Sequence, residues 1–390
     1  MNNKKKLFII AGETSGDIIG ENLIKQLQDE DCIIKGVGGD LMKKAGCDIL
    51  FHYDMIAVMG LSEVVSSYFK LMEYMKKTID ALMEFKPDLI ITIDSPGFNF
   101  RLIKFIRRRL KFKAIHYVAP TVWAYNRKRV EVVKKLFDHI LLILPFEKEY
   151  FKEMPHTFVG HPIVEDNSCL LQYSQDILEK DNLKLKSSTW DISIMVGSRK
   201  GEIKKHTKTI VEWINLMKIT FKKDIKFHFL TQPHLEQLLR DEINLYTNNL
   251  DKIFINSEVN SHNEIIEKSV LGIVKSGTAT MRFMANGTPV ITFYKVSKIT
   301  AWIMKRKLKI DKFNLCNIIT NSRTIPELIQ DDFYPIKLLV KSTALLTSSR
   351  ENILNCYLQT WNTLKQDQLP SKKAGEIVKK YLKNEADYNQ

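Results

Sequence analysis

The sequence predicts an α/β protein built from two doubly wound parallel-sheet domains. Short apolar runs alternate with longer amphipathic segments, and the runs are apolar on both faces, as parallel strands covered by helices are. The runs form two series separated by a polar stretch, and a length of 390 residues suits two or three domains. We therefore expect one domain over 1–165, a linker region over 166–190 and a second domain over 191–344.

Each element follows from its local pattern. The first series of apolar runs predicts strands at 6–11, 33–37, 89–94, 114–118 and 139–144. The second series predicts strands at 192–196, 226–230, 252–256, 270–274 and 289–294. Residues 61–85 carry apolar side chains at helical spacing, which predicts a core-facing helix or, because the segment is rich in methionine, a helix whose apolar face meets lipid. The part after residue 342 predicts two or three further helices.

Composition narrows the class of protein. Apolar residues make up 44% and charged residues 27%, as in soluble globular proteins. The apolar run 140–144 is far too short to span a membrane, and the stretch 7–11 is too short for the core of a signal peptide. Five cysteines at wide spacings form no zinc-binding pattern. We expect a reduced, cytoplasmic compartment, no metal and no cofactor.

The net charge of +14 is concentrated in two blocks. Residues 100–135 hold twelve Lys or Arg against one acid, and residues 295–312 hold seven against one. These blocks fit a solvated basic surface, or an anionic partner such as nucleic acid, a phosphorylated substrate or an acidic membrane. Trp123 and Tyr125 lie beside basic residues, but no nucleic-acid-binding motif accompanies them, so we expect no nucleic-acid partner.

The first half of the chain has two turns that could carry chemistry. Residues 11–17 follow a strand with glycines at positions 12 and 16, and Glu13 and Asp17 make this turn suited to hydroxyl recognition or base chemistry. The alternative is helix capping by Ser15 or Asp17. Asp94 ends the strand predicted at 89–94, where ligands bind in open α/β sheets, and is the best candidate for a general base. Its alternative role is to cap the segment that follows.

The second half offers two turns suited to an anion. Gly197, Ser198 and Arg199 supply backbone donors, a hydroxyl and a guanidinium between a strand and a helix. Residues 275–280 form a similar turn of small and hydroxylated residues. Two such turns in one domain favour a nucleotide diphosphate. His116, in contrast, lies within or just after a strand and is more typical of a core histidine.

Read in order, these turns resemble the bacterial lipid-A-disaccharide synthases, inverting glycosyltransferases of lipid A biosynthesis in Gram-negative bacteria. The order and spacing hold from about residue 7 to 330. The matching stretches are 11–17, 57–60 with Glu63, 93–96, 98–99, 116–120, 122–124, 144–147, 160–162, 197–199 with Glu202, 276–280 and Asn317.

The resemblance implies a GT-B fold, with two Rossmann-like domains facing a central cleft and C-terminal helices, 345–390, crossing back to the first domain. It implies inverting transfer of 2,3-diacylglucosamine from its UDP conjugate to the 6-hydroxyl of 2,3-diacylglucosamine 1-phosphate, without a bound metal. Substrates of this kind imply a peripheral protein on the cytoplasmic face of the inner membrane, held by its basic and apolar patches. A homo-oligomer is compatible with the sequence.

The resemblance also assigns roles to residues. Asp94 matches the family's essential aspartate, the candidate base for the acceptor hydroxyl, and Arg199 matches its essential arginine, which we expect on the donor diphosphate. Ser276, Gly277 and Thr278 would lie against the same diphosphate, while Glu13 and Asn317 would line the cleft. The other substrate- or donor-binding positions implied by the match are Ser15, Gly16, Asp17, Met59, Gly60, Glu63, Asn99, His116, Ser198 and Glu202.

Two positions depart from the family's pattern. Gly97 stands where many members have an acidic residue, which indicates that this position is not essential. Arg282 stands where the family usually has a glutamate, which in GT-B enzymes commonly accepts the nucleotide ribose hydroxyls. A guanidinium has no acceptor, so the ribose is held otherwise, donor binding is weaker, or the activity is impaired. Two other functions therefore stay open: another UDP-sugar-using GT-B transferase or epimerase, and a non-catalytic relative that binds membranes or polyanions.

Overall fold

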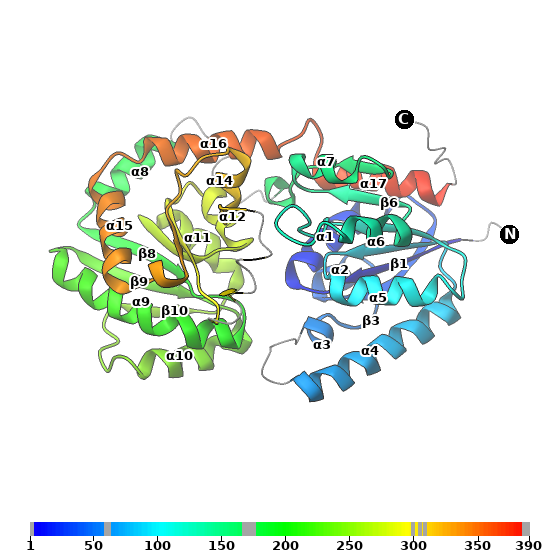
Figure 1. The fold of residues 1–390 in the computed structure, drawn as a ribbon, viewed down its shortest axis with the longest axis horizontal. Coiled ribbons are helices and arrows are strands. Elements are labelled where there is room, and N and C mark those ends of the chain that lie inside the picture. Colours follow the sequence, from blue (N-terminus) through cyan, green and yellow to red (C-terminus); the bar gives the residue numbers. More distant parts are fainter. Residues whose placement is uncertain are drawn as a thin grey trace. The chain divides into compact units, whose positions relative to one another are not determined.

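A computed structural model of the chain describes residues 4–57, 64–165, 177–297, 301, 302, 306 and 310–383. The chain divides into two compact units, one formed by Met1–Glu165 with Leu364–Gln390 and the other by Asp166–Thr363. Each unit contains one parallel sheet flanked by helices (Figure 1). The predicted architecture of two doubly wound parallel sheets is confirmed.

The described part of the first unit is built on seven parallel strands in the order β3-β2-β1-β4-β5-β6-β7. The strands are β1 Lys5–Ala11, β2 Cys32–Gly38, β3 Asp48–His52, β4 Leu89–Ile93, β5 Lys113–Tyr117, β6 His139–Leu142 and β7 His156–Phe158. The helices are α1 Thr14–Lys25, α2 Asp40–Lys44, α3 Asp54–Ala57, α4 Val64–Phe85, α5 Pro96–Ile106, α6 Arg129–Leu136, α7 Lys148–Phe151 and α17 Pro370–Leu382.

Alternation along β1 divides the core of the first unit into two layers. Phe8 and Ile10 point into the cluster that packs against α4 and α5. Leu7 and Ile9 point the other way, into the cluster that holds α1 and α17. Because successive side chains of a strand face opposite sides of the sheet, a run that is apolar at every position is buried on both faces. The sheet is therefore covered by helices on each side.

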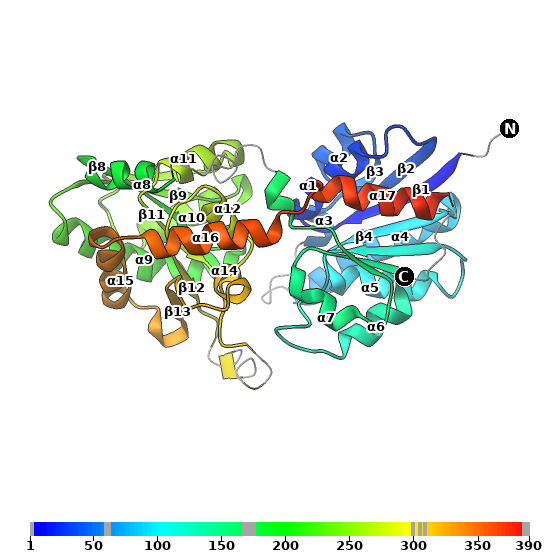
Figure 2. The same cartoon turned by 90° about the horizontal axis from the view of Figure 1, so that it is seen from above.

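Helix α17 completes the second of these layers although it comes from the far end of the chain. Ala374 and Val378 are fully buried in the cluster that contains Leu23 and Ile24 of α1. Figure 2 shows α17, in red, lying along α1. The Tyr381 hydroxyl donates to the carbonyl oxygen of Asp138 over 3.2 Å. The return to the first unit was expected from about residue 345, and the contacts place it at Leu364.

The second unit repeats the plan, with six parallel strands among its described residues in the order β10-β9-β8-β11-β12-β13. The strands are β8 Thr189–Met195, β9 Asp224–Leu230, β10 Ile253–Asn256, β11 Leu271–Lys275, β12 Val290–Tyr294 and β13 Glu327–Ile329. The helices are α8 Ile177–Lys186, α9 Lys200–Thr220, α10 Glu236–Asn244, α11 His262–Lys268, α12 Ala279–Ala285, α14 Leu315–Ile319, α15 Pro335–Thr347 and α16 Glu351–Leu364.

Helix α8 lies in the stretch expected to be a linker, yet it is part of the second unit. Arg350, at the turn between α15 and α16, pairs with Asp181 of α8, with 2.8 Å between Arg350 Nε and Asp181 Oδ2. Both side chains are almost fully buried, at 3% exposure each. A paired, hydrogen-bonded charge can be buried where an isolated one cannot, so this contact fixes α8 against the rest of the unit.

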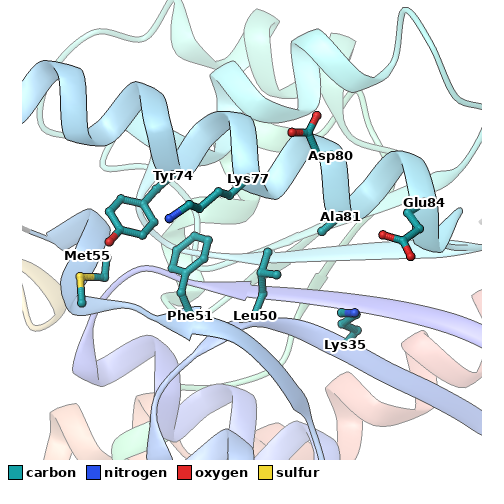
Figure 3. A pocket seen from close by; sticks show the side chains of 9 residues that line it. All are labelled: Lys35, Leu50, Phe51, Met55, Tyr74, Lys77, Asp80, Ala81 and Glu84. Atoms are coloured by element: carbon teal, nitrogen blue, oxygen red, sulfur yellow. The ribbon is translucent and has the colours of Figure 1, made fainter.

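A pocket of about 440 Å³ lies between α4 and the edge of the first sheet (Figure 3). The ring of Tyr74 packs against that of Phe51 with 4.8 Å between centroids, and the ammonium of Lys77 lies over Tyr74. The other lining residues are Lys35, Leu50, Met55, Asp80, Ala81 and Glu84. No candidate site residue in the described part of the chain lines this pocket.

Within the described residues, no helix is long and apolar enough to cross a membrane.

Candidate active site

The candidate residues gather at the same topological position in each unit. In the first sheet, β1 lies beside both β2 and β4, so the chain leaves β1 in one direction and returns to its other side. In the second sheet, β8 lies between β9 and β11 in the same way. Ligands of open α/β sheets bind at such switch points, beyond the carboxyl ends of the two central strands. The turns after β1, β4, β8 and β11 are the four turns singled out from the sequence.

Asp94 follows β4 in a strained backbone conformation. Its φ is +48° and that of Ser95 is +46°, a left-handed region that non-glycine residues seldom adopt. The Asp94 N–H donates to the carbonyl oxygen of Tyr117 over 2.9 Å, so the end of β4 is still tied to β5. These contacts fix the point at which the carboxyl side chain leaves the sheet.

Asn99 holds the other end of the same turn. Its side-chain amide donates to the Asp94 carbonyl oxygen over 2.7 Å, and its side chain is 0% exposed. The family resemblance implies that Asn99 binds substrate. The structure instead places it beneath the turn, where it contacts the backbone of Asp94 and is covered by protein.

The surroundings of Asp94 disfavour its charged form. Burial and, to a lesser degree, the nearby carboxylate of Glu13 raise the pKa of this carboxyl, whereas the N–H of Ser95 lowers it; together they place the pKa at about 6. A carboxylate with a pKa near neutrality accepts a proton more readily than an ordinary aspartate while still being ionised at pH 7. Asp94 therefore has the chemistry of a general base.

The turn after β1 interlocks with the turn after β4. A Cβ atom on Gly12 would lie 2.6 Å from the Ser95 Cβ and would also overlap its hydroxyl. On Gly16 it would lie 3.2 Å from the Ala11 Cβ. Glycine is required at position 12 because the Asp94–Ser95 turn occupies the space that any side chain would need.

The candidate residues of the turn after β1 differ in their exposure to solvent. Glu13 and Ser15 are exposed. Asp17 is buried, and its carboxylate accepts the N–H groups of Gly39 over 2.7 Å and of Leu41 over 3.1 Å at the start of α2. Capping, the alternative for Asp17, is thus observed on the neighbouring helix α2 rather than on its own helix α1.

His116 is a core histidine. It is 0% exposed, its Nδ1 lies 2.7 Å from the Thr92 hydroxyl, and its ring packs against Phe100 and Phe137. Burial lowers its pKa to about 3, so the ring is neutral. Met59, Gly60 and Glu63, also expected to bind substrate, lie outside the described residues.

In the second unit, Glu202 organises the turn after β8. Its carboxylate accepts the N–H of Ser198 over 3.0 Å and forms an ion pair with Lys275 over 3.1 Å. Burial opposes its ionisation, but Lys275, Ser198 and Arg199 together hold the pKa of Glu202 below its usual value. Gly197 has a φ of +134°, and a Cβ there would lie 2.6 Å from the Glu202 Cβ. Arg199, which precedes α9, is exposed.

The turn after β11 has an open upper surface. Gly277 has a φ of +157°, and among the described residues, apart from its neighbours in the chain, only the Lys275 ammonium, at 3.9 Å, comes within 4 Å of a Cβ built on it. Thr278 is exposed at the start of α12. Ser276 is buried, and its hydroxyl donates to the carbonyl oxygen of Phe313 over 2.7 Å. Gly277 and Thr278 can therefore meet a ligand with their backbone, whereas the Ser276 hydroxyl supports the turn from below.

Asn317 is likewise a supporting residue in this structure. It is 1% exposed, and its amide donates to Ile325 and Glu327 over 2.8 Å each. The Glu327 carboxylate in turn accepts the N–H of Phe313, whose carbonyl receives the Ser276 hydroxyl. Asn317 thus acts on the turn after β11 through a chain of hydrogen bonds.

Two further side chains belong to this region. Lys275 ends β11 beside the anion-suited turn, and the sequence reasoning quoted it without giving it a role. The sequence did contain a signal for this residue, because Lys275 is a charged residue that ends an otherwise apolar strand. Asp94 has the corresponding position directly after β4. Arg282 donates through Nε and Nη2 to the side-chain oxygen of Asn263 over 3.1 and 2.8 Å.

Two Rossmann-like units, one with a partly buried carboxyl group and the other with cationic, glycine-containing turns at the switch point, define a glycosyltransferase of the GT-B class. The family model "Lipid-A-disaccharide synthetase" matches residues 7–380. The chain is 36% identical over 332 residues to the lipid-A-disaccharide synthase of Rickettsia bellii (strain OSU 85-389), covering 84% of each chain. It is 34% identical over 388 residues to that of Rickettsia canadensis, covering 96% of this chain and 97% of the relative. The chain belongs to the lipid-A-disaccharide synthase family.

Solved structures agree on the fold. A putative UDP-N-acetylglucosamine 2-epimerase from Listeria monocytogenes superposes with a TM-score of 0.67 at 12% identity, covering 100% of this chain and 99% of that one. The calicheamicin glycosyltransferase CalG4 gives a TM-score of 0.59 at 13% identity, covering 99% and 100%. At these identities the likeness shows the fold alone, so the assignment to the synthase family depends on the sequence matches.

Proposed function

We propose that this glycosyltransferase moves 2,3-diacylglucosamine from its UDP conjugate to the 6-hydroxyl of 2,3-diacylglucosamine 1-phosphate, forming the β-1,6-linked disaccharide 1-phosphate and UDP. The observation that carries the proposal is Asp94, a partly buried carboxyl with a pKa raised to about 6 at the switch point of the first unit, in a chain of this family. Such a group suits the deprotonation of a sugar hydroxyl at neutral pH.

In the proposed reaction, Asp94 accepts the proton of the acceptor 6-hydroxyl while that oxygen forms a bond to C1 of the donor sugar. The bond from C1 to the diphosphate oxygen breaks as the new bond forms on the opposite face, which inverts the configuration. The negative charge that departs with UDP is taken up by Arg199 and by the backbone donors of Gly277 and Thr278. Fixed donors aimed at a developing charge are the largest source of catalysis in many enzymes.

A product assay tests this function. The purified protein is mixed with UDP-2,3-diacylglucosamine and 2,3-diacylglucosamine 1-phosphate, and lipid products are read by mass spectrometry. We expect a tetra-acyl disaccharide phosphate from the parent and from Asp40→Asn, a control carboxylate at the exposed start of α2, but none from a folded Asp94→Asn variant. Turnover of plain UDP-N-acetylglucosamine instead would indicate another UDP-sugar enzyme. UDP release from neither donor would indicate a binding protein.

We further propose that the protein acts at the cytoplasmic face of a membrane, where it binds acidic lipid. Phe69 and Met72 of α4 are 69% and 44% exposed, and Arg108 and Arg109 after α5 are exposed as well. Exposed apolar side chains and exposed cations in one unit support binding to an anionic bilayer. Arg107 is excluded from this set because it pairs with Asp138 over 2.6 Å.

Vesicle sedimentation tests the membrane proposal. Arg108→Gln/Arg109→Gln should pellet less with vesicles containing phosphatidylglycerol than the parent does, and the difference should shrink in high salt. The control is Lys43→Gln/Lys44→Gln, which removes two exposed charges from α2 of the same unit. Equal loss of binding in both double variants would indicate an effect of net charge and contradict the proposed surface.

A further inference from the structure

We propose that Lys275 binds the diphosphate of the donor, and that Glu202 holds the Lys275 ammonium in place until the diphosphate arrives. The inference rests on the proposed use of a UDP-sugar. It assigns a new role to a residue that neither the sequence reasoning nor the family match had placed in the site. It also changes the role of Glu202 from a donor-binding residue to an internal anion that occupies the Lys275 ammonium before the diphosphate binds.

The position of Lys275 in the sheet supports a contact with the donor. It is the last residue of β11, whose register pairs the preceding Val274 with Met195 near the end of β8. Lys275 therefore projects from the switch point of the second unit, where a ligand of an open α/β sheet binds. Its side chain is 21% exposed, so the ammonium is largely withdrawn from water but can still be reached.

The immediate surroundings leave room for an anion. The ammonium lies 3.9 Å from the position of a Cβ on Gly277, and apart from the neighbours of Gly277 in the chain no other group of the described residues comes within 4 Å of that position. It also lies 5.4 Å from the centre of the Tyr294 ring, which limits how far the side chain can swing. A phosphate above Gly277 would thus meet both the ammonium and the backbone of the turn.

Glu202 occupies the groups that a phosphate would use. One carboxylate oxygen contacts the Lys275 ammonium at 3.1 Å, and the other accepts the Ser198 N–H at 3.0 Å. An ammonium and a backbone N–H before a helix are typical phosphate donors, and here a single internal anion satisfies both. Among the described residues, Glu202 is the only ion-pair partner of Lys275. Binding of a diphosphate would add a second anion to this ammonium and displace or share the first.

The Lys275–Glu202 pair could be purely structural, or Lys275 could bind the ligand. The two explanations predict different effects on ligand affinity when Glu202 is neutralised. If the pair only stabilises the turn, removing either side chain weakens ligand binding similarly, because both changes disturb the same turn. If Lys275 binds the diphosphate, its removal weakens binding, whereas neutralising Glu202 removes a competing and repelling anion. The sign of the effect at Glu202 therefore separates the two explanations.

Isothermal titration calorimetry on the full chain, with UDP and uridine as probes, tests the inference. Lys275→Met should bind UDP about tenfold more weakly or worse, the loss expected for one charge-assisted contact, with an unchanged affinity for uridine. Lys275→Arg should recover most of the loss. Glu202→Gln should bind UDP at least as tightly as the parent. The control, Lys208→Met, removes the Lys208–Glu212 pair from the exposed face of α9 and should change neither affinity.

The outcomes distinguish the inference from the proposed function. A parent protein that binds no UDP would overturn both. Tight UDP binding by the parent and equally by Lys275→Met would overturn the role of Lys275 and leave the function standing. Parallel losses of UDP and uridine affinity in Lys275→Met and Glu202→Gln would show that the pair is structural. Circular dichroism of each variant establishes that it is folded.

Discussion

Asp94, Ser95 and Val118 all have positive φ angles, and all three follow the carboxyl ends of neighbouring strands β4 and β5. Non-glycine residues in this region cost about 1–3 kcal/mol each and persist only where the surrounding structure enforces them. Val118 is β-branched, which makes its conformation the least expected of the three. The strain is thus concentrated around the residue proposed to act as the base.

The charge of Asp94 adds a second cost, and its sign can be tested. Its pKa is about 6 in the folded protein against 3.8 for an unperturbed aspartate side chain. Ionisation therefore favours the unfolded chain, so stability falls as the pH rises from about 4 to 6 and stays lower above that range. Asn also tolerates the left-handed backbone well. Asp94→Asn should unfold at a higher temperature than the parent at pH 8.

Thermal unfolding of both proteins between pH 4 and pH 8 checks this prediction. The advantage of Asp94→Asn should be smallest at pH 4, where both side chains are neutral, and should grow through pH 6. A difference in unfolding temperature that is independent of pH would contradict the raised pKa.

The same pKa predicts how the reaction depends on pH. A general base acts in its ionised form, so kcat/KM should increase with pH and level off above about pH 6. The carboxylate of Glu13 raises the pKa of Asp94. Its removal should therefore move the inflection of the pH profile to lower pH. Steady-state rates of the parent and of Glu13→Gln across pH 4.5 to 8 measure the shift. Coincident profiles would exclude the proposed electrostatic coupling.

Asn99 should affect turnover more than substrate affinity, because it fixes the backbone of Asp94 and is fully buried. Asn99→Ala removes the 2.7 Å hydrogen bond and should reduce kcat by one to two orders of magnitude with little change in KM. Asn99→Gln tests whether an amide alone suffices. Thr360→Ala, another fully buried hydrogen-bonding position but in α16, is the control. A rise in KM with unchanged kcat would return Asn99 to substrate binding.

At the scale of elements, the turns after β1 and β4 pack closely because Gly12 has no side chain. Gly12→Ala would place a methyl group 2.6 Å from the Ser95 Cβ, so we expect it to displace the Asp94 turn and abolish most activity. Gly12→Ala/Ser95→Gly should restore activity, because glycine removes the obstacle and also suits the φ of +46°. Measuring disaccharide formation by the single and the double variant tests this prediction. An active Gly12→Ala single variant would show that the turn moves freely.

The sequence was sufficient for the central strands and for the turns that follow them. Strands such as β1 and β4 are apolar at every position, a pattern that only burial on both faces explains. The strands β3, β7 and β13 were not predicted, because they are short, lie at the sheet edges and are largely half-buried. Their patterns resemble those of loops.

The direction in which a side chain points was beyond the sequence. Asp17 and Asn317 belong to the same set of matched motifs as Asp94 and Arg199. In the structure, however, Asp17 binds the backbone at the start of α2, and Asn317 binds the backbone of the loop that ends at Ile325. A motif marks both the residues that face a ligand and those that hold them. Distinguishing the two requires contacts between segments far apart in the chain, such as the one between Ser276 and Phe313.

At the scale of the whole molecule, the first unit depends on α17. Gly375 packs against α1, and a Cβ there would lie 2.8 Å from the Gln26 Cβ. Gly375→Leu should therefore push α17 away from α1 and destabilise the first unit by about 1–3 kcal/mol. Glu376→Leu, on the exposed side of the same helix, is the control.

Hydrogen exchange read by mass spectrometry locates the effect. Gly375→Leu should lose protection in α1 and α17, while the strands β8–β13 keep theirs. Loss of protection in both units to the same extent would contradict the division of the chain at Glu165 and Leu364.

The position of α17 in the chain also sets the order in which the protein can be completed on the ribosome. The seven described strands of the first unit are synthesised before residue 159, but the helix that covers Leu23 and Ile24 begins only at Pro370. The whole second unit, Asp166–Thr363, is translated in between and can close its own core first. Until α17 is synthesised, one apolar face of the first sheet lacks its last cover, and of the two units the one begun first is the one finished last.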